Sequence, residues 1–171
     1  MKSRPKQISS IYVISEKNLY FCLAMKSREK HIIGRIEQVN LPEWEFVNLE
    51  AKIDTGAYTS SLHCHHLEVF QKNDENWIRF YLLDPDHISY NDRVLEMPIS
   101  DQREVKSSNG VSELRYFVET RIELFNKEYA IELSLADRSA MKYPLLIGRK
   151  FLKQGPFLVD ITQKNLSHKK V

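Results

Sequence analysis

The segment Ala51-Lys52-Ile53-Asp54-Thr55-Gly56-Ala57 carries the strongest signal in the chain. The apolar-rich run 46–53 leads directly into Asp-Thr-Gly, which predicts a strand that ends at Asp54 and turns at Gly56. An Asp-x-Gly triplet alone is common in turns, where its carboxylate is simply solvated. Here small residues follow it, and about ninety residues later a second apolar run, 145–148, also ends at a glycine. The two segments together indicate more than an ordinary turn.

The composition is that of an ordinary globular domain. The chain has 171 residues, enough for one domain with a core, and 25 basic against 23 acidic residues give a net charge of +2. That charge is too small to predict nucleic-acid binding. The sequence contains no run of about 18 apolar residues, so no membrane-spanning segment is predicted. Cys22 and Cys64 have no disulfide or metal-site spacing, so we expect a cytoplasmic location.

Beyond Met25 the pattern predicts strands almost throughout. Asn109-Gly110 lies between two long strand-like runs and is a hairpin signal, whereas a short helix is expected only at 149–153. The predicted strands are 32–39, 46–53, 67–70, 77–83, 94–105, 111–123, 129–135, 143–148 and 157–160. The predicted fold is therefore all-β, a closed β-barrel with one short C-terminal helix, spanning residues 25–162.

Both ends of the chain are expected to lie outside this domain. Residues 1–24 are predicted to be a disordered or marginal extension, because Glu16, Lys17 and Asn18 interrupt its apolar part. If that segment is a signal peptide instead, the location is extracytoplasmic. Residues 163–171 are predicted to form a basic, frayed tail.

The order of these features from Ala51 to Asp160 resembles the retropepsin fold of retroviral aspartic peptidases. The resemblance implies that Ile147 and Gly148 pack across the loop holding a catalytic aspartate. It also implies that 105–111 is the tip of a flap hairpin, and that 114–124 and 127–136 form the next hairpin. Asp54, Thr55 and Gly56 are then the catalytic loop of a closed, retropepsin-like barrel.

Longer motifs narrow the resemblance to one bacterial family. Segments 51–63, 105–110 and 137–149, with the opening Ile33-Gly-Arg-Ile-Glu37, are similar to the RimB-like family. Its members are often described as ATP-dependent zinc proteases and are now viewed as retropepsin-like. The family is associated with RimK-type ligases, which add glutamates to a ribosomal protein. The resemblance implies a protease acting on glutamate-rich tails. ATP has no site in the sequence, since no Gly-x-x-x-x-Gly-Lys-Ser/Thr loop occurs, and no cofactor is expected.

An aspartic peptidase needs two carboxylates around one water molecule. One is ionised and accepts the water's proton, and the other is protonated, because two carboxylates a few Å apart cannot both ionise. The chain has one Asp-Thr-Gly, and Asp101, Asp137 and Asp160 lack the Thr-Gly context. We therefore expect a C2 homodimer whose axis passes through the site.

The residues around Asp54 have expected roles taken from the resemblance. Thr55 would hydrogen-bond across the dimer axis, and the N–H of Gly56 would reach the carboxylate. Ala57 offers no hydroxyl to stabilise the ionised form, which predicts activity nearer neutral pH than in enzymes with Ser or Thr there. The resemblance implies that Arg149 braces the dimer, although Tyr58 stands where retroviral enzymes carry an acidic partner.

Several polar residues are candidates for binding an acidic substrate. Lys52 lies two residues before Asp54 on the same side of the strand, where it either reaches the substrate or extends into solvent. The polar flap tip and Arg138 are further candidates, because Arg grips carboxylates bidentately. For any single one of the six arginines considered, a surface or structural ion pair is the simpler expectation; they are Arg79, Arg93, Arg103, Arg115, Arg138 and Arg149. The proposed substrate contacts are Lys52, Ala57, Lys106, Ser107, Ser108, Asn109 and Arg138.

Two other functions compete with aspartic peptidase. A zinc peptidase would use His63 and His65 of His63-Cys64-His65-His66, but there is no H-E-x-x-H helix, and adjacent strand residues point to opposite faces. His63 also matches the family motif, which suggests a supporting role near Asp54. The other rival is a non-catalytic module that binds acidic tails and keeps Asp54 for structure.

Overall fold

The computed structural model describes residues 30–106, 110, 112–139 and 141–168. The predicted extension 1–24 and the proposed flap residues Ser107, Ser108 and Asn109 lie outside the described residues. Within the described part, no helix is long and apolar enough to cross a membrane.

The described chain is built mainly of strands, as predicted, with one short α-helix near its C-terminal end. In order, its elements are β1 (His31–Gly34), β2 (Ile36–Leu41), the 3-10 turn η1 (Pro42–Trp44), β3 (Phe46–Asp54), β4 (Ser60–Lys72), β5 (Glu75–Leu82), β6 (Val94–Pro98), β7 (Asp101–Lys106), β8 (Ser112–Leu124), β9 (Lys127–Ala136), β10 (Leu145–Gly148), α2 (Arg149–Gln154) and β11 (Phe157–Asp160).

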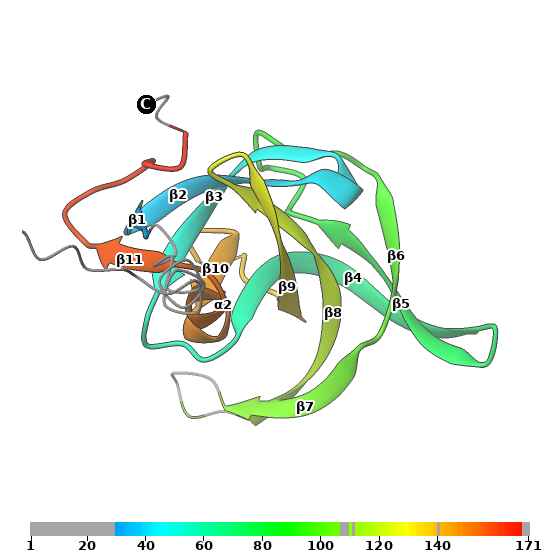
Figure 1. Ribbon diagram of the computed structural model, residues 1–171. Coiled ribbons are helices and arrows are strands. Elements are labelled where there is room, and N and C mark those ends of the chain that lie inside the picture. The colour runs from blue at the N-terminus through cyan, green and yellow to red at the C-terminus, as the bar shows by residue number, and fades with distance from the viewer. Residues whose placement is uncertain (1–29, 107–109, 111, 140, 169–171) are drawn as a thin grey trace, which may run out of the picture.

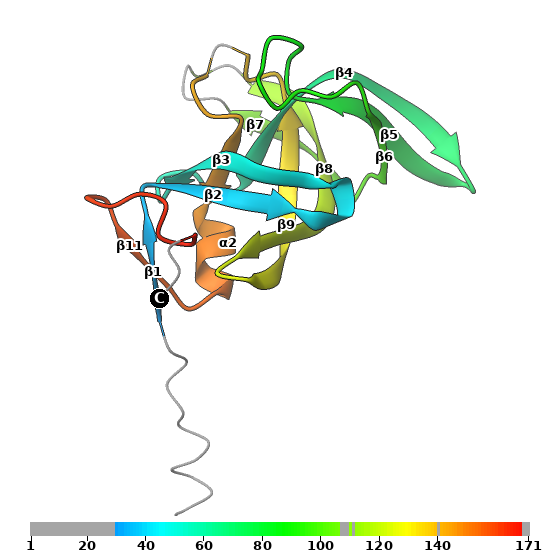
Figure 2. The ribbon, with the colours of Figure 1, turned by 90° about the horizontal axis from the view of Figure 1, so that it is seen from above.

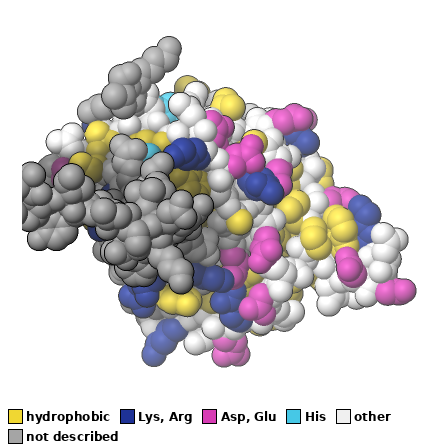
Figure 3. All heavy atoms as spheres, in the orientation of Figure 1, with side chains coloured by type: hydrophobic (Ala, Val, Ile, Leu, Met, Phe, Trp, Pro, Cys, Tyr) yellow, Lys and Arg dark blue, Asp and Glu magenta, His cyan; other side chains and the backbone are white. Residues whose placement is uncertain are grey.

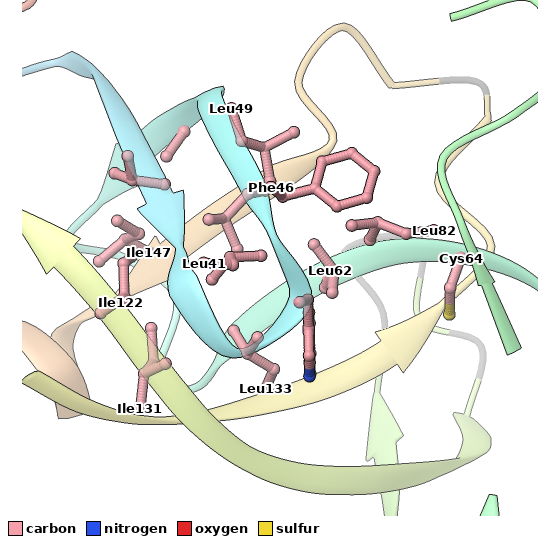
Figure 4. Close-up of a cluster of buried hydrophobic side chains, with 14 of the residues drawn as sticks. Leu41, Phe46, Leu49, Leu62, Cys64, Leu82, Ile122, Ile131, Leu133 and Ile147 are labelled. Atoms are coloured by element: carbon pink, nitrogen blue, oxygen red, sulfur yellow. The ribbon is translucent and has the colours of Figure 1, made fainter. Parts of the chain in front are cut away.

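The main sheet bends round until it meets itself. Its strand order is β10-β3-β2-β8-β9-β4-β5-β6, and β10 also pairs with β4, so the strands from β10 to β4 form a ring (Figure 1). Figure 4 shows apolar side chains from β2, β3, β4, β8, β9 and β10 pointing into this ring. Leu41, Leu49, Leu62, Ile122 and Leu133 are at most 1% exposed there, so the ring is filled by a core.

Strand β10 holds the two ends of the Asp54 loop together. It runs parallel to β3, with Gly148 opposite Asp54, and antiparallel to β4, with Leu146 opposite Ser61. All four of its residues are buried, as a short continuous apolar strand between two neighbours requires. The loop 55–59 therefore leaves and re-enters the sheet on either side of one rigid strand.

Three outlying pieces extend from the ring. The hairpin β4–β5 carries β6 on its outer edge, and β7 pairs antiparallel with the first half of β8, where the flap hairpin was expected. Strands β1 and β11 form a separate parallel pair. Figures 1 and 2 place that pair and the β4–β5 hairpin at opposite ends of the molecule, with α2 beside β1 and β11.

Two predicted strands are in fact broken. The run 32–39 divides at Arg35, where the chain leaves β11 and joins β3. The run 94–105 divides after Pro98, which has no N–H for a ladder. There the N–H of Ile99 bonds to the carbonyl of Asn76, whereas the N–H of Ser100 bonds to that of Phe117. In both runs the strand changes its pairing partner at the break, from β11 to β3 in the first run and from β5 to β8 in the second.

The predicted frayed tail is wrong for residues 163–168. Ser167 is 7% exposed, and its N–H and hydroxyl both donate to Glu37 Oε2, at 2.9 and 2.8 Å. Glu37 is fully buried and also accepts the N–H of Gly34 through Oε1. A Cβ on Gly34 would lie 2.7 Å from the backbone of Gln163 and Lys164, so glycine is needed for this close approach. The segment is fixed to β2 by buried hydrogen bonds.

Candidate active site

Asp54 lies at the end of β3 with one of its two oxygens held by the backbone. Oδ1 accepts the N–H of Gly56 at 2.9 Å and the N–H of Ala57 at 3.1 Å. Oδ2 has no hydrogen-bond donor among the described residues, and the side chain is half-buried. The carboxylate is thus oriented by the loop, with one oxygen left for a further partner.

Gly148 packs directly against the loop that carries Asp54. A Cβ on Gly148 would lie 2.6 Å from the carbonyl carbon and oxygen of Thr59, which leaves room for hydrogen alone. The N–H of Gly148 donates to Ser60 Oγ at 3.1 Å, and Ser134 Oγ donates to the Ser60 carbonyl at 3.1 Å. These buried bonds fix the end of the loop where β4 begins.

The first residues of α2 bind the outer part of the same loop. The N–H of Arg149 donates to the Ala57 carbonyl and that of Lys150 to the Tyr58 carbonyl, each at 2.9 Å. The Arg149 guanidinium lies 3.5 Å from the Gly56 carbonyl oxygen and 5.5 Å from the centroid of the Tyr58 ring. Arg149 therefore contacts the loop itself, through backbone and aromatic ring, within one chain.

Arg138 is close enough to Asp54 for the two charges to interact. Burial lowers the pKa of Arg138 and the nearby Arg115 lowers it further, whereas the negative charge of Asp54 raises it. The buried Nε of Arg138 has no hydrogen-bond partner among the described residues. Arg138 is thus a predicted substrate contact whose charge interacts with that of Asp54.

His63 holds the segment that carries Arg138. Its side chain is 5% exposed, its Nδ1 accepts the N–H of Arg138 at 2.7 Å, and its Nε2 lies 2.8 Å from Asp84 Oδ2. Since Nδ1 is an acceptor, the proton of the neutral ring belongs on Nε2, facing Asp84. Asp84 was missed by the sequence reasoning, which treated 84–87 as a plain loop. Its only sequence signal was its place directly after an apolar strand.

The histidine cluster does not fit a zinc site. Among the described residues, no group of three or more His, Cys, Asp or Glu side chains is arranged to hold a metal ion. Both nitrogens of His63 already face protein partners, and the His65 ring stacks on Tyr81 with 5.4 Å between centroids. Cys64 is buried and points at the Ala136 carbonyl.

Most of the other arginines considered as substrate contacts are in ion pairs. Arg79 binds Glu96 and Glu68, Arg93 binds Glu45, and Arg115 binds Glu113. Arg103 binds Asp101 and Glu132. Figure 3 nevertheless shows Lys and Arg side chains gathered at the lower left, over the turn after β3 and the end of β7. Lys52 is exposed, two residues before Asp54, and Lys106 ends β7.

Comparison with protein families gives a match over nearly all of the described chain. The model of the RimB-like family, described as retropepsin-like aspartic endopeptidase RimB, matches residues 32–170. A probable alpha-L-glutamate ligase of Parasynechococcus marenigrum is 36% identical over 135 residues, which are 77% of this chain and 28% of that protein. One of Desulfotalea psychrophila is 37% identical over 122 residues, or 71% and 26%. The chain thus spans little more than a quarter of these ligases.

A solved structure has the same fold. The protein Lpg0085 of Legionella pneumophila, of unknown function, superposes with a TM-score of 0.65 at 26% identity. The match covers 81% of this chain and 99% of that one.

Proposed function

The chain belongs to the RimB-like family of retropepsin-like aspartic endopeptidases, and on this premise we propose that it hydrolyses peptide bonds as a homodimer. The observation that carries the proposal is the state of Asp54. One carboxylate oxygen is bound by two backbone N–H groups, and the other is left without a described donor. To act as an aspartic peptidase, such a carboxylate needs a second carboxylate beside it, and the sequence has a single Asp-Thr-Gly.

The proposed reaction uses Asp54 of both protomers. The ionised carboxylate accepts a proton from water as the water oxygen attacks the peptide carbonyl carbon. The protonated carboxylate gives its proton to the carbonyl oxygen, which yields a neutral tetrahedral diol. The C–N bond then breaks as the amide nitrogen takes a proton from the carboxyl group that accepted the water's proton, while the other carboxylate takes a proton from a hydroxyl of the diol. The products are an acid and an amine, and the pair again shares one proton.

An exposed apolar surface near the catalytic loop supports dimerisation. Ile32 on β1 and Leu158 on β11 are paired in register and are 52% and 49% exposed. Tyr58 on the loop is 55% exposed. The carbonyl of Arg35, directly after β1, accepts the N–H of Ile53, so this strand pair lies against the catalytic strand. Among the described strands, β1 and β11 pair only with each other, so each has an outer edge that a second copy would cover.

The relatives suggest the class of substrate. In them, a region similar to this chain belongs to a longer protein named a probable alpha-L-glutamate ligase. A peptidase domain joined to a ligase that makes glutamate chains would meet glutamate-rich tails. Lys52 and Arg138, two cations near Asp54, suit such a substrate. We propose glutamate-rich peptide tails as the substrate, including those added to a ribosomal protein.

An Asp54→Asn variant tests the chemistry. Asn keeps an oxygen that accepts the two loop N–H groups, so the fold should persist, but it cannot take the water's proton. We expect cleavage of poly-α-glutamate to fall at least about a hundredfold, with unchanged circular dichroism and sedimentation. EDTA should have no effect. Unchanged cleavage by the variant, or loss of cleavage in EDTA, would refute the aspartic mechanism.

A non-catalytic module for acidic tails is the alternative. The cations near Asp54 favour binding as much as they favour catalysis, and Arg149 and Gly148 give Asp54 a structural setting. This alternative predicts that the wild-type chain binds poly-α-glutamate and never shortens it, as judged by mass spectrometry after long incubation.

A pH–rate profile adds a further check on the proposed peptidase, since Ala57 at the loop predicts an optimum nearer neutrality than pH 3.

A further inference from the structure

A pocket beside the catalytic strand brings together cations from four separate segments. Its volume is about 460 Å³. Arg35 comes from the corner between β1 and β2, Lys52 from β3, Lys142 from the approach to β10 and Lys164 from the C-terminal segment. Glu50 is the only acidic residue among the described residues that line it. The pocket therefore carries four positive side chains against one negative.

Backbone hydrogen bonds hold these segments together. The N–H of Arg35 donates to the Gln163 carbonyl at 2.9 Å, and the N–H of Asn165 donates to the Ile36 carbonyl at 2.8 Å. The Arg35 carbonyl accepts the N–H of Ile53 at 3.0 Å. Lys52 stands opposite Ile36 on one side and Leu146 on the other. The convergence of the cations is thus built into the fold and does not depend on flexible side chains alone.

None of the four cations forms an ion pair with a carboxylate among the described residues. Elsewhere in the molecule Arg79 and Arg103 each contact two carboxylates. Gathering like charges around one hollow costs repulsive energy, so this arrangement does not serve the stability of the fold. It does create a positive potential that attracts an anion.

The pocket lies within reach of a substrate at Asp54. Lys52 and Asp54 are two residues apart on the same side of β3, which corresponds to roughly 7 Å along a strand. An extended peptide repeats its side chains at the same interval, so a neighbouring side chain of a peptide at Asp54 falls beside Lys52. Lys142 also lines a second hollow with His63 and Arg138, which links the pocket to Arg138, whose charge interacts with that of Asp54.

We propose that the pocket formed by Arg35, Lys52, Lys142 and Lys164 is a subsite for a side-chain carboxylate of an acidic peptide. The proposal rests on the proposed function, because it takes Asp54 as the point where the peptide is cut. In this proposal the four cations make the site prefer an acidic side chain, and the negative charge of Glu50 weakens that preference. A peptide whose neighbouring residue is glutamate binds there through charge-assisted hydrogen bonds to Lys52 and Lys142.

Binding is best measured on the full chain carrying Asp54→Asn, so that the probe is not cut. The probe is fluorescein-labelled hexa-α-glutamate, followed by fluorescence anisotropy at low salt. Lys52→Gln and Lys142→Gln should each raise Kd about threefold to tenfold, and added salt should shrink these differences. Glu50→Gln should lower Kd, because it removes the opposing charge. Lys127→Gln, the same charge change on the exposed first residue of β9, should leave Kd within about twofold.

The opposite sign expected for Glu50→Gln separates binding from simple damage to the fold. If Lys52→Gln and Lys142→Gln weaken binding no more than Lys127→Gln, or if Glu50→Gln also weakens it, the proposal is wrong. Inorganic phosphate that displaces the probe far better than free glutamate would assign the pocket to phosphate and likewise overturn it.

The same measurements separate this proposal from the proposed function. If the wild-type chain cuts peptides but the pocket variants bind the probe normally, the peptidase stands and the subsite fails. If the variants show the expected pattern of Kd but the wild-type chain cuts neither acidic nor neutral peptides, the subsite stands and the peptidase fails.

Discussion

At the scale of single residues, the reactivity of Cys64 tests whether the core inside the ring of strands is closely packed. Its side chain is fully buried on β4, and burial raises the pKa of the thiol from 9.0 to about 12. Only the thiolate reacts with iodoacetamide, so in a Cys22→Ser background we expect alkylation at pH 8 about a thousandfold slower in the native chain than in urea. Fast alkylation of the native chain would contradict the burial of β4.

The direction of this shift also fixes how stability depends on pH. The folded state holds the Cys64 proton more tightly than the unfolded state, in which the thiol ionises near 9.0. Its contribution is therefore complete below that pH and is lost as the pH rises towards about 12.

Single residues differ in how well the sequence predicted them. The position of Asp54 at a strand end opposite Gly148 was predictable, because a contiguous Asp-Thr-Gly turn and one apolar-glycine run determine it. The contact between His63 and Arg138 joins residues 75 positions apart, and Asp84 reaches His63 from a third segment. No local pattern encodes such contacts. The ion pairs of Arg79 and Arg103 likewise depend on which strands become neighbours.

At the scale of elements, β10 and α2 hold the loop that follows Asp54, and the closest packing between them is at Gly148. Gly148→Ala places a methyl group within 2.6 Å of the Thr59 backbone, so the loop must move. We expect a loss of roughly 1–3 kcal/mol in unfolding free energy and a larger loss of peptidase activity, because Asp54 lies opposite Gly148. Urea titration and peptide cleavage measure the two effects.

The control for this variant is Lys153→Ala, on the exposed side of the same helix. It should change stability by less than about 0.5 kcal/mol. If Gly148→Ala were as stable and as active as that control, the close packing between β10 and the loop would be disproved.

The C-terminal segment is an element held by one buried carboxylate. Glu37→Ala removes the acceptor for the Gly34 N–H and for both donors of Ser167. Buried donors left without partners are costly, so we expect the unfolding free energy to fall by about 3 kcal/mol. Amide exchange at Asn165 and Ser167 should accelerate at the same time, because their hold on β2 is lost.

Glu119→Ala on the exposed face of β8 is the matched control, and it should change stability by less than about 0.5 kcal/mol. Exchange in residues 163–168 that is already fast in the wild-type chain would show that the segment is not fixed in solution.

Strands and helices were predicted well where a single run of residues pairs or packs with the same neighbour along its whole length. Strand β11 has the predicted bounds Phe157–Asp160, and the helix was expected at 149–153 and runs to Gln154. The sequence could not reveal the break at Arg35, because apolar residues continue on both sides while the strand changes neighbours. The C-terminal segment was misjudged for a related reason. Its polar composition resembles a solvated tail, yet its hydroxyl and backbone satisfy a buried glutamate.

At the scale of the whole molecule, the ring of strands gives the proposed half-site at Asp54 a rigid support. Strands β3, β10 and β4 hold both ends of the Asp54 loop, and α2 holds its middle. Beyond the ring, the flap hairpin and the exposed pair β1–β11 extend from the core. Rigid loop support and exposed apolar strands within one chain are the combination that a site shared between two copies requires.

Mixed dimers test that sharing directly. If each active unit needs Asp54 from two copies, an Asp54→Asn chain that pairs with a wild-type chain will form an inactive dimer. With nine variant chains per wild-type chain and free exchange, the activity of a fixed amount of wild type should fall to about a tenth, because pairing is statistical in a C2 dimer. The measurement is cleavage of a glutamate-rich peptide after the two proteins are mixed, unfolded in urea and refolded together. As a control, a doubly substituted chain, Asp54→Asn with Ile32→Asp, carries a charge on the exposed face of β1 and should poison far less. Activity that stays constant as the variant is added would mean that one chain holds a complete site.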